Sequence, residues 1–248
     1  MANILEVSNL SMYYITKAAT VRAVEDVSFN IVEGETFGLV GESGCGKSTT
    51  ARTIMRLIPP VGKIVSGKVM YHGQDVVKMN NHELRQLRGR QIGMIFQDPM
   101  TSLNPVTPVS KQFYECLRRD GMTKPQMRER AIELLRLVGI PEPEKRLDNY
   151  VHELSGGMRQ RVMIAIALAS QPKLLLADEP TGALDYQTGK AILKLLQDTC
   201  HSTGKTVVLI THNAAFTDIA DRVIHIREGR VAGVECNDRP LSADVLEW

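Results

Sequence analysis

A glycine-rich segment followed by lysine and serine is the first group of residues whose types and spacing could do chemistry. Residues 41–48 read Gly-Glu-Ser-Gly-Cys-Gly-Lys-Ser and fit the phosphate-loop pattern at every fixed position. The apolar run 36–40 precedes them, and residues 49–57, without Gly or Pro, follow, which predicts a strand-to-helix turn. Loop amides and the helix N-terminus would then surround phosphate oxygens. We expect Lys47 to reach the β- and γ-phosphates of ATP and Ser48 to bind Mg²⁺.

The expected phosphate-binding set is this loop together with the residue after it. Its members could all present an amide or a polar side chain to phosphate: Gly41, Ser43, Gly44, Cys45, Gly46, Lys47, Ser48 and Thr49. Of the four cysteines, Cys45 lies inside the loop, so its alkylation is expected to block nucleotide access. The alternative is a glycine-rich turn with a chance Lys-Ser pair, which the flanking patterns do not favour.

Two neighbouring acids, Asp178 and Glu179, follow an apolar run at residues 173–177. A fully buried parallel strand has this pattern, and ligands of open α/β sheets bind at the carboxyl ends of such strands. We expect Asp178 to help hold Mg²⁺ and Glu179 to polarise the attacking water. A solvated acidic turn is the alternative, and the phosphate loop in the same chain argues against it.

A third motif, Leu-Ser-Gly-Gly-Met at residues 154–158, precedes a stretch that is apolar on most faces and is predicted to be a helix. Ser155 is suited to be its N-cap. A capping hydroxyl, glycine amides and a helix dipole together make a second anion site. Two phosphate cradles in one chain suggest that one nucleotide lies between two chains; an ordinary capped helix is the alternative.

In this order the motifs resemble those of the ATP-binding cassette (ABC) ATPases, over roughly residues 4–230. The resemblance implies an α/β fold, namely a P-loop NTPase with a RecA-like core, an antiparallel β layer and an inserted α-helical subdomain. It also implies that two cassettes pair head to tail. Ser155 and Gly157 would then touch the γ-phosphate held by the partner's Lys47.

The resemblance implies roles for four further residues that residue type alone would not single out. Gln97, after an apolar run, would sense Mg²⁺ and water, and Asp185 would communicate across the dimer. His212 would contact the γ-phosphate and so act in catalysis with Glu179. Tyr14 is expected to stack on adenine, which needs only a flat aromatic face; Tyr13, pointing the other way in an extended segment, is the alternative.

Composition and patterning bound the rest of the interpretation. The 248 residues can bury a full core, and a formal charge of +2 is too balanced to indicate nucleic acid. The cysteines show no metal-ligand spacing and suit a reducing cytosol. The apolar run 162–169 is too short for a bilayer span, and the N-terminus lacks the pattern of a secretory signal. We therefore expect the cytoplasmic face of the membrane, reached through a permease.

One ABC ATPase domain is expected over residues 1–230 and a short C-terminal tail over 231–248, whose single Trp248 either docks or hangs free. Alternating apolar residues near 5–7 and 27–31 predict an antiparallel layer. Between about 98 and 169 strand patterns give way to helical ones, which marks the inserted subdomain.

The resemblance divides along the chain when subfamilies are considered. Residues 96–105 and 150–165 resemble the dipeptide, oligopeptide and nickel importer ATPases, whereas residues 179–190 and the C-terminal end resemble lipoprotein-release and macrolide-exporter ATPases. In the ATPases that they resemble, residues 96–105 and 150–165 would flank the groove that binds a permease's coupling helix. The resemblance therefore favours peptide (or nickel) uptake. The alternative is an ATPase of an export or mechanical-signalling complex that moves no small solute.

The expected partners follow from this resemblance. They are transmembrane permease subunits, which bind through their coupling helices, and a second ABC ATPase subunit, identical or paralogous. The importer interpretation adds an extracytoplasmic solute-binding protein.

Overall fold

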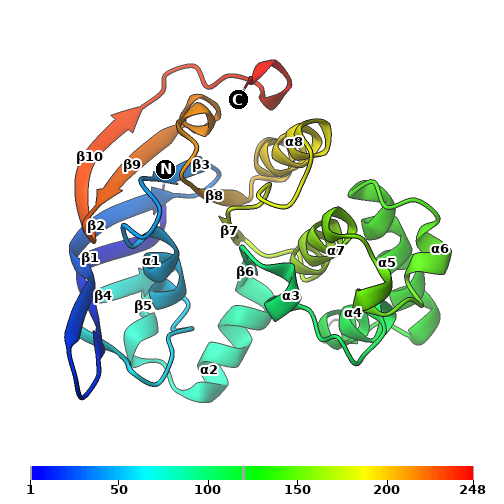
Figure 1. Ribbon diagram of the computed structural model, residues 1–248, viewed down its shortest axis with the longest axis horizontal. Helices are drawn as coiled ribbons and strands as arrows, with labels where there is room; N and C mark the ends of the chain where they lie inside the picture. Colours follow the sequence, from blue (N-terminus) through cyan, green and yellow to red (C-terminus); the bar gives the residue numbers. More distant parts are fainter. Residues whose placement is uncertain (1, 119–120, 248) are drawn as a thin grey trace.

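An antiparallel sheet forms one layer of the protein, whose computed structural model describes residues 2–118 and 121–247 (Figure 1). Its strand order is β2-β1-β4-β5, with bounds Thr20–Val32, Asn3–Ile15, Gly62–Tyr71 and Gln74–Asp75. Leu5 pairs with Ile31, and Val7 with Phe29, so the predicted antiparallel pairing is confirmed. Leu5, Val7 and Ile31 are buried, as the alternation requires.

The second layer is a sheet of order β10-β9-β3-β8-β7-β6. The strands span Arg230–Cys236, Arg222–Arg227, Thr36–Val40, Thr206–Thr211, Leu174–Asp178 and Ile92–Ile95. All neighbours pair in parallel except β9 and β10. The four strands β3, β6, β7 and β8 are buried at every residue, which explains their continuous apolar sequences.

Helices cover the sheets and join them. Helix α1 (Lys47–Ile54) contacts β2 of one sheet and β7 and β8 of the other, so it packs between the layers. The remaining helices of this body are α2 (Asn81–Gln86), a π-helical turn (Leu87–Gln91), α8 (Tyr186–Thr203) and short 3₁₀ turns at Val76–Lys78 and Ala214–Ile219. Within the described ranges, no helix has both the length and the apolar character needed to cross a bilayer.

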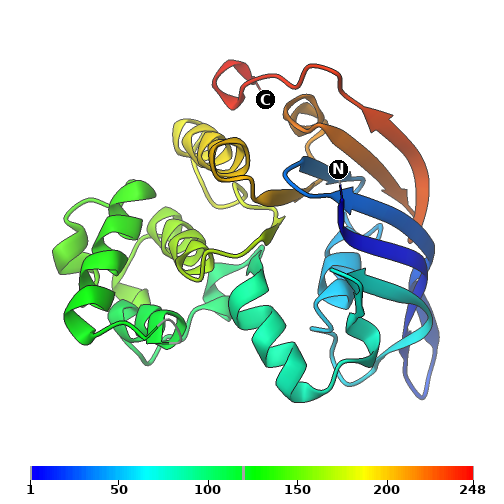
Figure 2. The same ribbon diagram turned by 180° about the vertical axis from the view of Figure 1, so that it is seen from behind.

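A helical subdomain projects from the end of β6, as both ribbon views show (Figures 1 and 2). It contains α3 (Pro99–Ser102), α4 (Val109–Leu117), α5 (Lys124–Leu137), α6 (Pro143–Arg146), a 3₁₀ turn (Val151–Glu153) and α7 (Gly156–Ala169). Phe113, Leu117 and Leu135 are fully buried in its core. The predicted subdomain at about 98–169 therefore has the expected helical character.

The expected domain boundary at residue 231 falls inside strand β10, which continues to Cys236. The β9 strand pairs with β10 along its whole length, so the body extends beyond the boundary that the resemblance suggested. After β10 the described residues include two that are buried, namely Ala243, in a 3₁₀ turn at Ala243–Val245, and Leu246. Trp248 lies outside the described residues.

We predict that Phe113→Ala lowers the free energy of unfolding by about 3–5 kcal/mol, because it removes a large, fully buried side chain. Urea titration followed by circular dichroism measures the change. Val106→Ala, at a side chain 79% exposed in the same subdomain, is the matched control and should change stability by less than about 0.5 kcal/mol. Equal stability of the two variants would contradict the packing described for this core.

Candidate functional site

The phosphate loop connects β3 to α1 and is pressed against neighbouring backbone. A Cβ atom on Gly41 would lie 2.2 Å from the carbonyl oxygen of Ile226 on β9. Gly46, the N-cap of α1 with φ of 109°, would place one 2.5 Å from the carbonyl oxygen of Ala23 on β2. Only glycine fits at such positions. The two strands therefore fix the loop, whose residues Ser43 and Gly44 remain exposed to solvent.

Lys47 is the first residue of α1 and is 5% exposed. Its Nζ atom donates to the carbonyl oxygens of Gly41 at 2.7 Å and Glu42 at 2.8 Å, so the side chain folds back over the loop. Carbonyl groups are neutral acceptors, and a phosphate would offer the ammonium stronger, charge-assisted hydrogen bonds. The lysine is thus held ready for an anion in the loop.

Ser48 and Asp178, both expected to hold Mg²⁺, meet at the start of α1 and the end of β7. The Ser48 Oγ donates to Asp178 Oδ1 at 2.7 Å. The other oxygen, Oδ2, is buried without a hydrogen-bond partner. Burial raises the pKa of the Asp178 carboxyl, and the hydrogen bond from Ser48 opposes this shift. A hydroxyl beside an unsatisfied carboxylate oxygen is a donor set that suits a hard divalent cation.

Magnesium fits this site better than a metal that needs a full protein cage. Among residues 2–118 and 121–247, no cluster of three or more His, Cys, Asp or Glu side chains could hold a metal. Mg²⁺ is usually held by one or two protein oxygens together with waters and substrate phosphates. Ser48 and Asp178 supply two such protein oxygens beside a phosphate loop, which matches the coordination preference of Mg²⁺.

Glu179 is held at the carboxyl end of β7 by the end of β8. Its Oε1 accepts from the backbone N–H of His212 at 2.9 Å and lies 2.7 Å from His212 Nδ1. Its Oε2 accepts from the Thr211 hydroxyl at 3.2 Å. The φ angle of Glu179 is 47°, a left-handed conformation that costs about 1–3 kcal/mol for a residue other than glycine and concentrates at functional sites. The direct Glu179–His212 pair is a feature that the sequence analysis did not predict.

Gln97 lies at the same edge of the sheet. Strands β6 and β7 are parallel, and Ile95 pairs with Ala177, so Gln97 and Glu179 each lie two residues beyond this pair. The Gln97 side chain is exposed. The edge therefore brings together Lys47, Ser48, Gln97, Asp178, Glu179 and His212 from four segments of the chain.

The third motif lies on the helical subdomain. Ser155 is the N-cap of α7, and its Oγ accepts from Met158 N at 3.3 Å, which confirms the predicted cap. Ser155 and Gly156 are exposed, and a Cβ on Gly156 would meet no atom within 4 Å. The N-terminus of this 14-residue helix therefore presents amide groups and a positive dipole end to solvent.

Asp185 is also exposed, and it caps α8 by accepting from Thr188 N at 3.1 Å. Hydrogen bonds from Thr188 hold the pKa of the Asp185 carboxyl below its usual range. The preceding turn lies beside the third motif, because a Cβ on Gly157 would be 3.6 Å from Leu184 Cδ2. The exposed cap of α7 and the turn before α8 thus share one side of the chain.

A buried glutamine joins the third motif to the acidic strand end. Gln160, on α7, is 0% exposed and donates from Nε2 to the carbonyl oxygen of Pro180 at 3.0 Å. Pro180 directly follows Glu179. No sequence pattern predicts this link, because Gln160 lies in the apolar stretch of α7 and only folding brings it to Pro180.

Tyr14 lies on β1, where it pairs with Val21 of β2 and Gly62 of β4. Its half-buried ring packs against the core between the two sheets. The neighbouring Tyr13 ring faces the Arg22 guanidinium at 5.7 Å. The two rings therefore have different surroundings, and the adenine-stacking role of Tyr14 stays a prediction.

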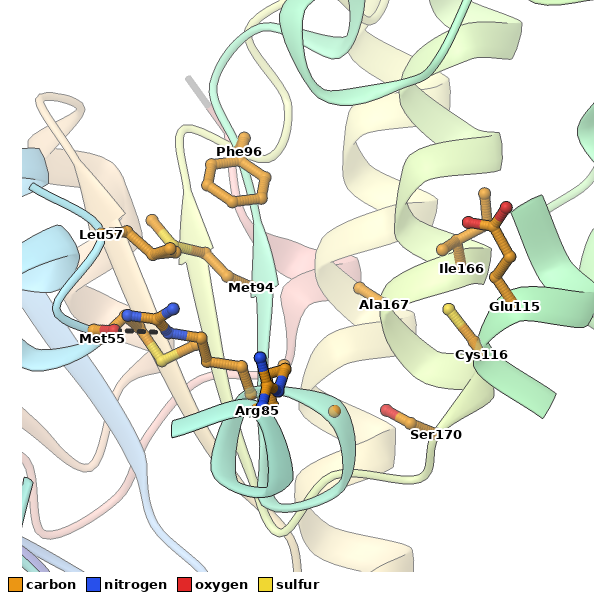
Figure 3. A pocket seen from close by; sticks show the side chains of 13 residues that line it. Met55, Leu57, Arg85, Met94, Phe96, Glu115, Cys116, Ile166, Ala167 and Ser170 are labelled. Atoms are coloured by element: carbon orange, nitrogen blue, oxygen red, sulfur yellow. Dashed lines mark hydrogen bonds between the residues drawn. The ribbon is translucent and has the colours of Figure 1, made fainter. Parts of the chain in front are cut away.

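A groove of about 430 Å³ separates the core from the helical subdomain (Figure 3). Leu57, Met94 and Phe96 line its core side, and Cys116 and Ile166 line the opposite wall (Figure 3). Charged side chains from both bodies also border it, namely Arg85, Arg88 and Glu115. The groove thus has an apolar floor and a charged margin.

Comparison with known proteins places these features in one family. The family model described as ABC transporter matches residues 24–182. The oligopeptide transport ATP-binding protein OppD of Bacillus subtilis (strain 168) is 46% identical over 93% of this chain, which spans 65% of that relative. The dipeptide transport ATP-binding protein DppD of Escherichia coli (strain K12) is 45% identical over 95% of this chain, which spans 72% of that relative.

Solved structures agree with the sequence relatives. The ATP-binding cassette MJ0796, in a dimeric post-hydrolysis state bound to ADP and Pi, superposes with a TM-score of 0.86 at 32% identity. The match covers 94% of this chain and 98% of that one. The two-layer core with its helical subdomain is therefore the fold of an ABC cassette.

We predict that alkylating Cys45 with N-ethylmaleimide abolishes nucleotide binding, because its Sγ lies 3.9 Å from Lys47 Nζ inside the loop. Fluorescent ATP-analogue titration measures the loss. Cys45→Ser keeps the other three cysteines and should bind normally before and after treatment. Normal binding by the alkylated wild-type protein would contradict the assignment of this loop to nucleotide binding.

Proposed function

The chain belongs to the ABC transporter family, and from this premise we propose that it hydrolyses ATP in a head-to-tail dimer to power a membrane permease for peptides. The observation that carries this proposal is the exposed N-terminus of α7. Its Ser155 and glycine amides are suited to bind an anion, yet they belong to the helical subdomain rather than to the loop that holds Lys47. A second cassette would supply the phosphate for this motif.

The chemistry that we propose uses the residues at the sheet edge. Lys47 and the loop amides hold the phosphates, while Ser48, Gln97 and Asp178 are the groups that would hold Mg²⁺. The cation, when bound, would offset negative charge on the phosphate oxygens. Glu179 would polarise the attacking water, since its carboxylate is fixed by Thr211 and His212.

Closure of the proposed dimer would place the partner's Ser155 and Gly157 at the γ-phosphate. His212 is suited to a second contact, because its side chain is 62% exposed although its Nδ1 is engaged by Glu179. Asp185 would face the partner cassette from the exposed turn before α8. Contacts at Gln97 and Ser155 would then turn the helical subdomain as a rigid body.

We propose that the groove of Figure 3 receives a coupling helix of the permease. The groove lies between the core and the subdomain that moves against it, and a rod seated there would be displaced by that motion. Its apolar floor, with the exposed Arg85 and Glu115 at the margin, suits a short amphipathic helix with charged ends. Permease binding would place the protein at the cytoplasmic face of the membrane.

Peptides are the solute class that the relatives support, because OppD and DppD are named for oligopeptide and dipeptide transport. These relatives match 93–95% of the chain, including the later part that resembles exporter ATPases. An extracytoplasmic binding protein and a second ATPase subunit, identical or paralogous, complete the proposed importer.

We predict that Glu179→Gln lowers ATP turnover at least about a hundredfold, because it removes the proposed general base. The amide should still accept hydrogen bonds, so ATP should bind and trap the dimer. Phosphate release and size-exclusion chromatography with Mg-ATP measure the two effects. Glu129→Gln, at an exposed residue of α5, is the control. Undiminished turnover in Glu179→Gln would remove this residue from its role.

We predict that a bulky maleimide on Cys116 abolishes stimulation of the ATPase by its permease yet leaves ATP binding intact, because Cys116 lines the groove. The measurement uses the permease co-purified from gently solubilised membranes, with Cys45→Ser and Cys236→Ser in the labelled protein. Cys200 is fully buried, and burial raises the pKa of its thiol, so it reacts slowly. The matched control carries Cys45→Ser and Cys116→Ser but keeps the exposed Cys236. Label on Cys236 in that protein should have no effect on stimulation. If the permease still stimulates the ATPase fully after Cys116 is labelled, the permease binds outside this groove.

A further inference from the structure

The segment after β10, residues 237–247, turns back across the molecule and reaches α8 (Figures 1 and 2); we call it the C-terminal strap. Its first residue, Asn237, is tied to the body by three hydrogen bonds. The backbone N–H donates to Asp221 O at 2.8 Å, and Nδ2 donates to Thr217 O and Ala220 O at 2.8 and 2.7 Å. The strap therefore begins in a fixed position.

Gln197, in the middle of α8, anchors the strap with both ends of its amide. The side chain is 5% exposed. Its Nε2 donates to Leu241 O at 2.8 Å, and its Oε1 accepts from Ala243 N at 2.9 Å. A buried side-chain amide that pairs with backbone groups of a second segment fixes the register between them.

The strap then reaches the first residue of α8. The Tyr186 hydroxyl donates to Leu246 O at 3.1 Å, and Leu246 is 3% exposed. An ion pair between Lys194 and Asp244 adds an exposed contact along the helix. The strap thus holds α8 at its middle and at its N-terminal end, although the two segments lie about 60 residues apart at this contact.

Tyr186 directly follows Asp185, the exposed cap that the proposed function places against the partner cassette. We propose that the C-terminal strap positions Asp185 for the dimer, with Tyr186 and Leu246 as positioning residues. The first turn of a helix has unsatisfied N–H groups and frays when its tertiary contacts are lost. Thr188, whose N–H donates to the Asp185 carboxylate, lies in this turn. Because the strap holds the turn, loss of the Tyr186–Leu246 contact would let the turn and the carboxylate it binds fray together. This inference rests on the proposed function.

The experiment compares four substitutions, each in the Glu179→Gln background that traps the ATP-bound dimer. Tyr186→Phe removes only the hydroxyl, and Leu246→Ala removes the buried side chain. Val245→Ala, at a neighbour 62% exposed, is the matched control, and Asp185→Ala is the reference. Sedimentation velocity gives the dimer dissociation constant in Mg-ATP, a fluorescent analogue gives the nucleotide affinity of the monomer, and thermal melting reports stability.

Asp185→Ala and Tyr186→Phe should each weaken the dimer by about fivefold or more, the usual scale of one lost hydrogen bond. Leu246→Ala keeps the backbone acceptor but removes the buried side chain that seats the strap, so it should weaken the dimer as well. Monomer nucleotide affinity and the Val245→Ala dimer should stay unchanged. A weak dimer for Asp185→Ala with normal dimers for both strap variants, even if their melting temperatures fall, would overturn the strap proposal alone. A normal dimer for Asp185→Ala would overturn both the strap proposal and the contact assigned to Asp185 in the proposed function.

Discussion

The parallel register of β3, β8 and β7 is the constraint on which the rest of the structure depends. Val40 pairs with Thr211, and Asp178 pairs with Ile210, so three strands end at one edge. The next residues along each strand are the phosphate loop, Glu179 and His212. A shift of one residue in any pairing would turn each side chain to the opposite face of the sheet. The buried apolar sequences of these strands are therefore as important to the site as the polar residues that follow them.

The site combines one strained backbone angle with two charged side chains whose hydrogen-bond partners are neutral. Glu179 adopts a left-handed backbone angle, Asp178 keeps an unpaired buried oxygen, and Lys47 bonds to the carbonyls of its own loop. The Lys47 ammonium would gain from a bound phosphate and the Asp178 oxygen from a bound cation. The α7 cap, by contrast, is exposed and linked to the sheet edge through Gln160. Contacts of one nucleotide with the sheet edge of one chain and the α7 cap of another would thus favour the closed dimer.

Local patterns predicted the parts of the fold and site that local residues determine. The phosphate loop, the Ser48–Asp178 pair, the Ser155 cap and the helical subdomain follow from short motifs and periodicity. The Glu179–His212 pair, the Gln160–Pro180 link and the strap on α8 join segments 20 to 60 residues apart, and nothing in either segment identifies its partner. The expected boundary at residue 231 falls inside β10, because that strand is defined by its pairing with β9 rather than by its own sequence.

The central claim is that each nucleotide lies between two chains, and mixing two inactive variants tests it most directly. Lys47→Ala disables the phosphate loop, and Ser155→Arg disables the α7 cap. In a head-to-tail dimer with one chain of each variant, both defects fall in the same site and the other site is intact. Random pairing makes half of the dimers mixed, so ATP hydrolysis by an equal mixture should recover to about a quarter of the wild-type rate. A mixture no faster than the mean of the two variants would contradict the shared site.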